Sequence, residues 1–231
     1  MDDTPSDINL ASSEDILLLG KTEHREKFDY FSLEGWEAAK KRTKDFYEQV
    51  KADISLNNYA GISAFPLSHI PLLVYLGFLI GDKIPVTTFQ YARNENHWIC
   101  CSPDGKSRFG EVQVSETRRV KKQLIVSISA SARVHKEDIQ EALNTDLENF
   151  DEFHITTENP IIDNDLFYEE VKLMQTTFKQ KVEKLHGENR YEMIHLFAAV
   201  PAGLAVEIGR SINGNMWCPM SLYNYRFRKK T

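Results

Sequence analysis

The sequence predicts an α/β protein made of two similar lobes that face each other about a pseudo-two-fold axis. Three observations predict this class. Strand-like and helix-like segments alternate along the 231 residues, which is typical of α/β folds with largely parallel strands. A long stretch of the first half recurs in the second half. Both copies place the start of a helix directly against the end of a buried strand.

The first half reads as an α/β unit behind an acidic start. We expect residues 1–13 to be a mobile tail and residues 14–122 to form the first lobe. Its predicted elements, in order, are a short buried strand (15–20), a long helix (32–54) with Ser32 as N-cap, a strand (59–65), a loop and buried helix (66–80), a strand (84–92), and a Trp-bearing strand, turn and charged linker (94–122).

The second half, residues 123–231, is predicted to be the second lobe and runs through the same kinds of element. The predicted order is a buried strand ending in small residues (122–134), a helix (135–150), a strand (152–158), a second long helix (163–187), a strand (191–197), an apolar helix (201–212) and a last strand (217–227).

An internal repeat relates the two halves without a gap. A shift of 132 residues gives twelve identities over the 55 positions from 37 to 91. The identities extend over a long helix, a strand, a buried helix and a strand in the same order; among them are Val74 with Val206 and Gly77 with Gly209. The repeat is too long for a solenoid and favours two fused lobes that share one crevice, where open α/β sheets bind ligands.

The strand-to-helix junctions are the first candidate sites. The first amides of a helix lack intrahelical partners and lie at the positive end of its dipole, so they can hold a phosphate without a basic side chain. Pro201 suits the first position of the second-half helix. The candidate residues at the two junctions are Pro66, Leu67, Ser68 and His69 in the first half, and Ala199, Val200, Pro201, Ala202 and Gly203 in the second. Ordinary tight connections between strand and helix would have the same appearance.

Two further groups are predicted near the same crevice. Ser129, Ser131 and Arg133 follow a buried strand and precede a helix, so they are expected at the same end of the sheet. The alternative is that they are only the polar end of a strand. Arg93 can pair with a phosphate, and Trp98 can stack on a base or belong to the core.

Composition excludes several classes of function. A net charge of −6 and a pI near 5.7 argue against a partner of duplex nucleic acid. The histidines lack metal-ligand spacing, so no metal or other cofactor is expected. Three cysteines without a disulfide pattern favour a reduced protein, and the acidic start lacks a leader pattern, which favours the cytoplasm. The longest apolar run, residues 70 to 80, is too short to span a bilayer, so no membrane partner is expected. The basic end, residues 225–231, is a solvated terminus or a phosphate or partner contact.

Two stretches resemble the SAVED domain of bacterial antiphage systems (CBASS and type III CRISPR). They are "GISAFPLSHIPLLVYLGFLIGDKIPVTTFQYARNENHW" and "IHLFAAVPAGLAVEIGRSINGNMWCPMSLYNY". The resemblance implies two fused CARF-like, Rossmann-type lobes. It also implies a cyclic oligonucleotide ligand, such as a cyclic tri- or tetra-adenylate, in a groove across both lobes.

The expected function is therefore a non-enzymatic sensor that assembles head to tail on binding its ligand. No effector domain is recognised in the sequence, so the resemblance implies a separate effector (protease, nuclease, TIR or membrane protein), unless the chain is part of a longer fusion. Two alternatives stay open: a ring nuclease that cleaves the same ligand, and a structural subunit of a defence complex.

Overall fold

The computed structural model describes residue 29 and residues 32–92, 96–100, 111–161 and 167–224. Five predictions lie outside the described residues: the mobile tail 1–13, the strand 15–20, the site residue Arg93, the turn of the 94–122 segment at residues 103–105 and the basic end 225–231.

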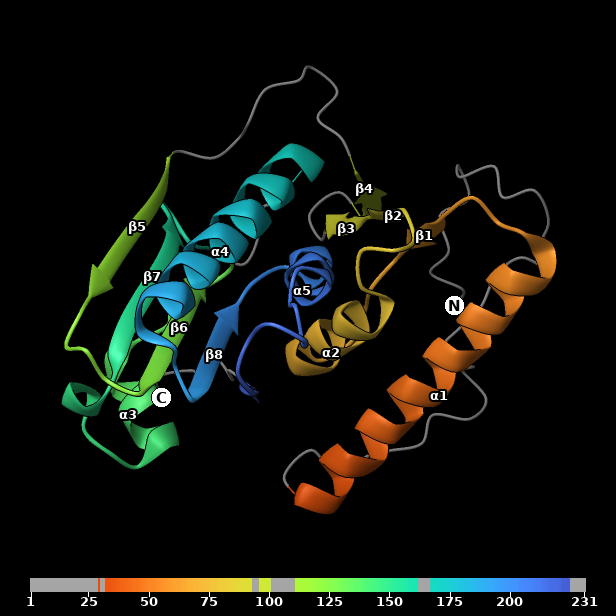
Figure 1. The fold of residues 1–231 in the computed structure, drawn as a ribbon. Coiled ribbons are helices and arrows are strands. Elements are labelled where there is room, and N and C mark those ends of the chain that lie inside the picture. The colour runs from red at the N-terminus through yellow and green to blue at the C-terminus, as the bar shows by residue number, and fades with distance from the viewer. Residues whose placement is uncertain (1–28, 30–31, 93–95, 101–110, 162–166, 225–231) are drawn as a thin grey trace.

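A five-stranded sheet organises the second half (Figure 1). Its strands are β5 (Val112–Thr117), β6 (Gln123–Ser129), β7 (Asp151–Thr157), β8 (Met193–Ala199) and β9 (Met220–Tyr223). They lie in the order β5-β7-β6-β8-β9, with all neighbours parallel except the antiparallel pair β5 and β7. The predicted α/β class with largely parallel pairing is confirmed.

Strand β5 replaces part of the charged linker that the sequence predicts. Four of its six residues, Gln113 to Glu116, are exposed, and its apolar residues are only Val112 and Val114. It forms because the backbone N–H and C=O groups at the edge of β7 need partners, which a polar segment supplies as well as an apolar one. The predicted border between residues 122 and 123 consequently falls between two strands of one sheet.

Helices cover the two faces of this sheet unequally (Figure 1). Helix α4 (Tyr168–Asn189) buries one stripe at three- and four-residue spacing: Val171, Met174, Phe178, Val182 and Leu185. This stripe shares a hydrophobic core with strand residues such as Phe153 and Ile155. A short helix α3 (Lys136–Leu143) and the 3₁₀ turn Leu147–Asn149 supply residues to a smaller core with Ile125 and Phe197.

Before β5, the described residues of the first half form two helices and four short strands. They are α1 (Leu33–Asn57), β1 (Ile62–Ala64), α2 (Ile70–Ile80), β2 (Val86–Thr88), β3 (Gln90–Ala92) and β4 (His97–Ile99). β1 pairs in parallel with β2, and β3 pairs antiparallel with β4. The predicted N-cap is confirmed: the Ser32 hydroxyl oxygen accepts the N–H of Gly35 at 3.1 Å.

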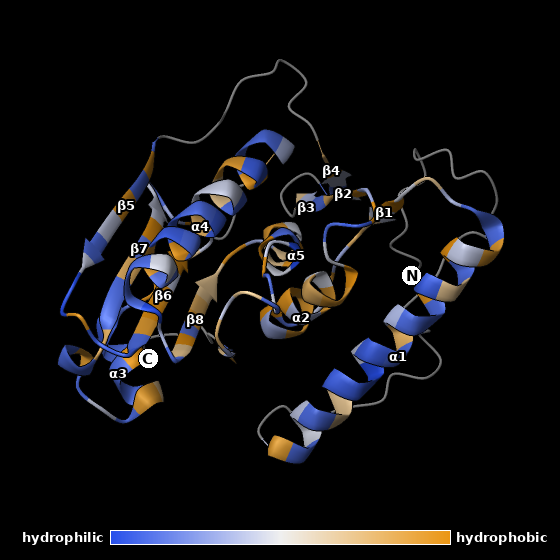
Figure 2. Cartoon of the chain, viewed as in Figure 1, coloured by the Kyte–Doolittle hydropathy of each residue, from blue (hydrophilic) through white to orange (hydrophobic). Residues whose placement is uncertain are grey.

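Helix α2 packs against α5 (Ala202–Arg210) at the centre of the molecule, and α1 lies on the far side of α2 (Figure 1). Figure 2 shows α2 as largely apolar and α1 as largely polar, as expected for a buried helix and a surface helix. The starts of α2 and α5 are separated by 132 residues, as are the ends of α1 and α4. These bounds agree with the predicted repeat, which itself stays a prediction.

Candidate ligand-binding site

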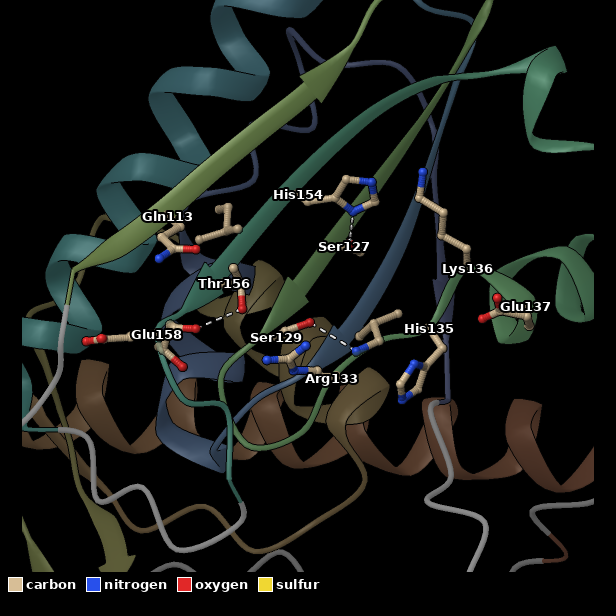
Figure 3. Close-up of a pocket in the computed structure, with 13 residues that line it drawn as sticks. Gln113, Ser127, Ser129, Arg133, His135, Lys136, Glu137, His154, Thr156 and Glu158 are labelled. Atoms are coloured by element: carbon tan, nitrogen blue, oxygen red, sulfur yellow. Dashed lines mark hydrogen bonds between the residues drawn. The ribbon is translucent and has the colours of Figure 1, made fainter. Parts of the chain in front are cut away.

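A pocket of about 450 Å³ opens where the parallel strands β6 and β7 end (Figure 3). Two strand ends, the loop after β6 and the start of α3 form its walls, and most of the lining residues carry polar side chains. The lining residues are Gln113, Ser127, Ser129, Arg133, Val134, His135, Lys136, Glu137, His154, Ile155, Thr156, Thr157 and Glu158.

Two of the predicted site residues, Ser129 and Arg133, line this pocket. The hydroxyl oxygen of Ser129 accepts the backbone N–H of Val134 at 3.0 Å, which shapes the loop that carries Arg133. The Arg133 side chain is exposed. Lys136 adds a second cation from the first turn of α3. An anionic ligand therefore meets positive charge on this side of the pocket, while Glu137 and Glu158 supply negative charge elsewhere in the lining.

Backbone hydrogen bonds hold the same loop against the second-half junction. The N–H groups of Ala130 and Ser131 both donate to the carbonyl oxygen of Ala199, at 2.9 and 2.8 Å. The predicted loops 129–133 and 199–203 are thus brought together. Ala199 and Val200 are buried, and Ser131 is half-buried and contributes no pocket lining.

The N-terminus of α5 differs from the prediction in two ways. Pro201 is the N-cap residue and not the first helical residue, and its carbonyl accepts the N–H of Ala205. Ala202 is the first residue of the helix and is half-buried. The N–H of Gly203 donates to the side-chain oxygen Oε1 of Gln90 at 3.0 Å. The amide predicted to hold a phosphate therefore already has a partner from the first half.

The first-half junction does not contribute to the pocket. Pro66 is buried, Leu67 is exposed, and Ser68 and His69 are half-buried. His69 is the N-cap of α2, and its carbonyl accepts the amides of Leu72 and Leu73 at 3.0 and 3.1 Å.

Trp98 lies in an aromatic cluster of the first half. Its ring is edge-on to Phe65 and to Tyr91, with centroid distances of 5.2 and 5.3 Å. The indole is half-buried in this cluster. These contacts favour the core interpretation of Trp98 over the stacking platform.

A polar cluster of three residues that were not predicted lies at this pocket: Ser127 and His154 line it, and Glu152 is buried next to His154. The hydroxyl of Ser127 is hydrogen-bonded to Nδ1 of His154 (Figure 3). The other ring nitrogen, Nε2, lies 3.3 Å from Oε2 of Glu152. Burial lowers the pKa of His154, and Glu152 only partly opposes this effect. The imidazole is therefore neutral at pH 7.

Glu152 stays ionised although it is buried. Burial alone would raise the pKa of its carboxyl, but the hydrogen bond from Arg119 and the charge of Lys136 bring the pKa below its usual value. Arg119 Nη1 lies 2.8 Å from Oε1, and Lys136 Nζ lies 3.5 Å from Oε2. The carboxylate fixes the imidazole so that Nε2 carries the proton and Nδ1 accepts from Ser127.

A local signal for this cluster was present in the sequence. Phe153 and Ile155 alternate with Glu152, His154 and Thr156, which places the three polar side chains on one face of β7. The alternation alone does not show that this part of the β7 face lines a pocket and is not covered by helix α3.

Within the described ranges, no group of three or more His, Cys, Asp or Glu side chains could hold a metal ion. Over the same ranges, no helix combines the length and apolar character needed to span a membrane.

Comparison with known proteins gives a family. The sequence model of SAVED, the "SMODS-associated and fused to various effectors sensor domain", matches residues 43–231. No match was found among curated protein sequences.

Similar solved structures are Cap4 SAVED/CARF-domain receptors. The Acinetobacter baumannii receptor with 2′3′3′-cAAA has a TM-score of 0.59 at 15% identity, covering 84% of this chain and 41% of that receptor. The same receptor with 3′3′3′-cAAA gives 0.58 at 16%, covering 89% and 43%. The Moraxella osloensis receptor gives 0.50 at 16%, covering 84% and 40%. The chain thus spans about two-fifths of these receptors, and the likeness extends to the fold. Since the family model covers most of the sequence, the chain belongs to the SAVED family of sensor domains.

Proposed function

We propose that this chain senses a cyclic oligoadenylate of an antiphage defence system and binds it where loops 129–133 and 199–203 meet the pocket at the ends of β6 and β7. The observation that carries the proposal is this convergence: a polar pocket of about 450 Å³, two cations beside it and a junction of small residues hydrogen-bonded to the same loop. SAVED membership and the cyclic trinucleotides bound by the Cap4 neighbours support this ligand class.

Calorimetric titration with cyclic tri- and tetra-adenylates, each with all 3′ linkages and with one 2′ linkage, tests binding and ring size together. We expect micromolar or tighter binding of one of them, and Arg133→Ala to weaken it roughly ten-fold because a charge-assisted hydrogen bond to phosphate is lost. Lys122→Ala is the matched control, since Lys122 is exposed and precedes β6 at the opposite end of the strand. Absence of binding for every ring would refute the proposal.

The finer steps of the proposed function are head-to-tail assembly and activation of an effector held in trans, in the cytoplasm. Ligand at saturation should increase the size of the particle in light scattering. An unchanged size would remove the assembly step and leave the binding step in place.

A second candidate function, cleavage of the bound ring, is supported by the His154 cluster. A neutral imidazole held by Glu152 is a competent general base near the ligand. Nδ1, the ring nitrogen without a proton, would take the hydroxyl proton of Ser127 while the Ser127 oxygen takes the proton of a ribose 2′-hydroxyl. The 2′-oxygen would attack the adjacent phosphorus, and the 5′-oxygen would leave and take up a proton from water. Incubation with labelled ligand distinguishes the candidates: linear product that disappears in His154→Gln supports cleavage, and intact ligand after hours excludes it.

A further inference from the structure

Gln90 is buried at the point where the two halves of the chain meet. It lies on β3 and is only 4% exposed. Its Oε1 accepts the N–H of Gly203, 113 residues away in sequence. A Cβ at Gly203 would come within 2.3 Å of Gln90 Nε2, so the absence of a side chain at position 203 makes room for the carboxamide.

The other end of the carboxamide has no partner. Gln90 Nε2 is buried and forms no hydrogen bond to any described residue. A buried donor without a partner costs about 1 to 3 kcal/mol, and such groups are uncommon in folded proteins. Its orientation follows from its neighbour, because the N–H of Gly203 requires an acceptor and so directs the carbonyl oxygen toward the helix.

This arrangement extends the N-terminus of α5. The helix is nine residues long, and its N-cap residue, Pro201, makes no side-chain capping bond. The carboxamide accepts from the positive end of the helix, which polarises it and strengthens Nε2 as a donor. Gln90 Nε2 is therefore a neutral hydrogen-bond donor to an anion, placed at the positive end of the α5 dipole.

We propose that Gln90 is a ligand-binding residue whose Nε2 donates to a phosphate oxygen of the bound oligonucleotide. The proposal rests on the proposed function and adds to it a first-half residue, at a contact between the halves. Because Gln90 is only 4% exposed and does not line the pocket at the ends of β6 and β7, the proposed binding includes a local opening of the contact between β3 and α5. The phosphate oxygen would then accept the hydrogen bond from Nε2.

Two substitutions separate the roles of the carboxamide. Gln90→Glu keeps an oxygen for the N–H of Gly203 and replaces the donor by a second oxygen. Gln90→Met removes both functions at similar volume. We expect affinity for the cyclic triadenylate at pH 7 to fall roughly ten-fold in Gln90→Met and roughly a hundred-fold or more in Gln90→Glu, where a carboxylate faces phosphate.

Acidification adds a readout that a structural role would not change. Protonation of the carboxyl introduced by Gln90→Glu restores a donor, so the affinity of this variant should approach that of the unmodified protein as the pH falls. Unfolding in urea, measured in parallel, shows whether each variant is folded at the pH used.

The outcomes are distinct. Binding by Gln90→Glu as tight as that of the unmodified protein, or weaker only in Gln90→Met, would overturn the proposal and leave the proposed function intact. Absence of binding by the unmodified chain would overturn both. If neither variant folds, the side-chain amide signals of Gln90 in the unmodified protein decide, assigned through their proximity to the Gly203 amide. A shift of these signals on addition of ligand supports the donor, and unchanged signals at saturation overturn it.

Discussion

The backbone of Val206 lies where a side chain on Gly77 would stand. A Cβ at Gly77 would be 2.0 Å from the carbonyl oxygen of Val206, and a Cβ at Gly209 would be 2.0 Å from the carbonyl oxygen of Val74. A shift of 132 residues turns each pair into the other. Reciprocal contacts of this kind are what a two-fold relation between the halves requires.

Replacement of either glycine should separate α2 from α5. We expect Gly77→Ala and Gly209→Ala each to reduce the free energy of unfolding by about 3 kcal/mol or more, because the new methyl group would overlap backbone that cannot move independently. Gly187→Ala is the control. No atom lies within 4 Å of a Cβ there, and Ala should stabilise helix α4 by about 0.5 kcal/mol. Chemical denaturation measures all three; equal stability of the three variants would contradict the packing argument.

Arg210 joins α5 to the loop that follows α2. Its Nη1 lies 2.9 and 3.0 Å from the two oxygens of the fully buried Glu207, and Nε and Nη2 each donate at 3.0 Å to the carbonyls of Gly81 and Ile84. Arg210→Met should cost about 3 to 5 kcal/mol of unfolding free energy, since one side of a buried carboxylate and two carbonyls lose their donors.

The matched control for Arg210 is Lys122→Met. Lys122 and Glu192 form an ion pair in which both side chains are about 70% exposed, so its loss should change stability by less than about 1 kcal/mol. Similar losses in the two variants would show that the buried network is not the stronger contact.

Asp151 should make stability depend on acid pH. Burial would raise the pKa of this carboxyl, but the amides of Arg119 and Lys121 and the hydroxyl of Tyr191 together bring the pKa below its ordinary value of 3.8. The unfolded state therefore binds the proton first. The contribution of Asp151 is present above the unfolded pKa and is lost as the pH falls through the folded pKa. In urea unfolding below pH 5, Asp151→Asn should show a shallower loss of stability with acid than the unmodified protein; parallel curves would contradict this.

His195 should make folding stability depend on pH in a higher range than Asp151 does. Burial lowers the pKa of its imidazole, which lies between Tyr223 and Gln123 at 2.9 and 2.8 Å. Protons then bind the unfolded state more readily as the pH falls below 6.5, so the folded state loses stability toward the folded pKa. His195→Gln should remove this part of the decline in melting temperature between pH 7 and 5. An unchanged slope would show that His195 does not carry it.

Two of the thirteen lining residues of the pocket, Ser129 and Arg133, were predicted, because they follow a strand end. Ser129 and Arg133 come after a buried strand of a parallel sheet, and the carboxyl ends of such strands meet at one edge. Their place in the pocket therefore followed from the order of elements. The loop 66–69 follows a strand too, but it belongs to a different, smaller sheet and does not contribute to the pocket.

The sequence by itself determined most of the order of strands and helices, the presence of a buried helix within 66–80 and the N-cap at Ser32, because periodicity and capping depend on residues within one or two turns. Only the tertiary structure decided that β5 joins the second-half sheet, that His154 meets Ser127 and Glu152, and that Gln90 holds the amide of Gly203. The last of these pairs lies 113 residues apart. Such contacts depend on how whole elements pack, and no local pattern of residues encodes that packing.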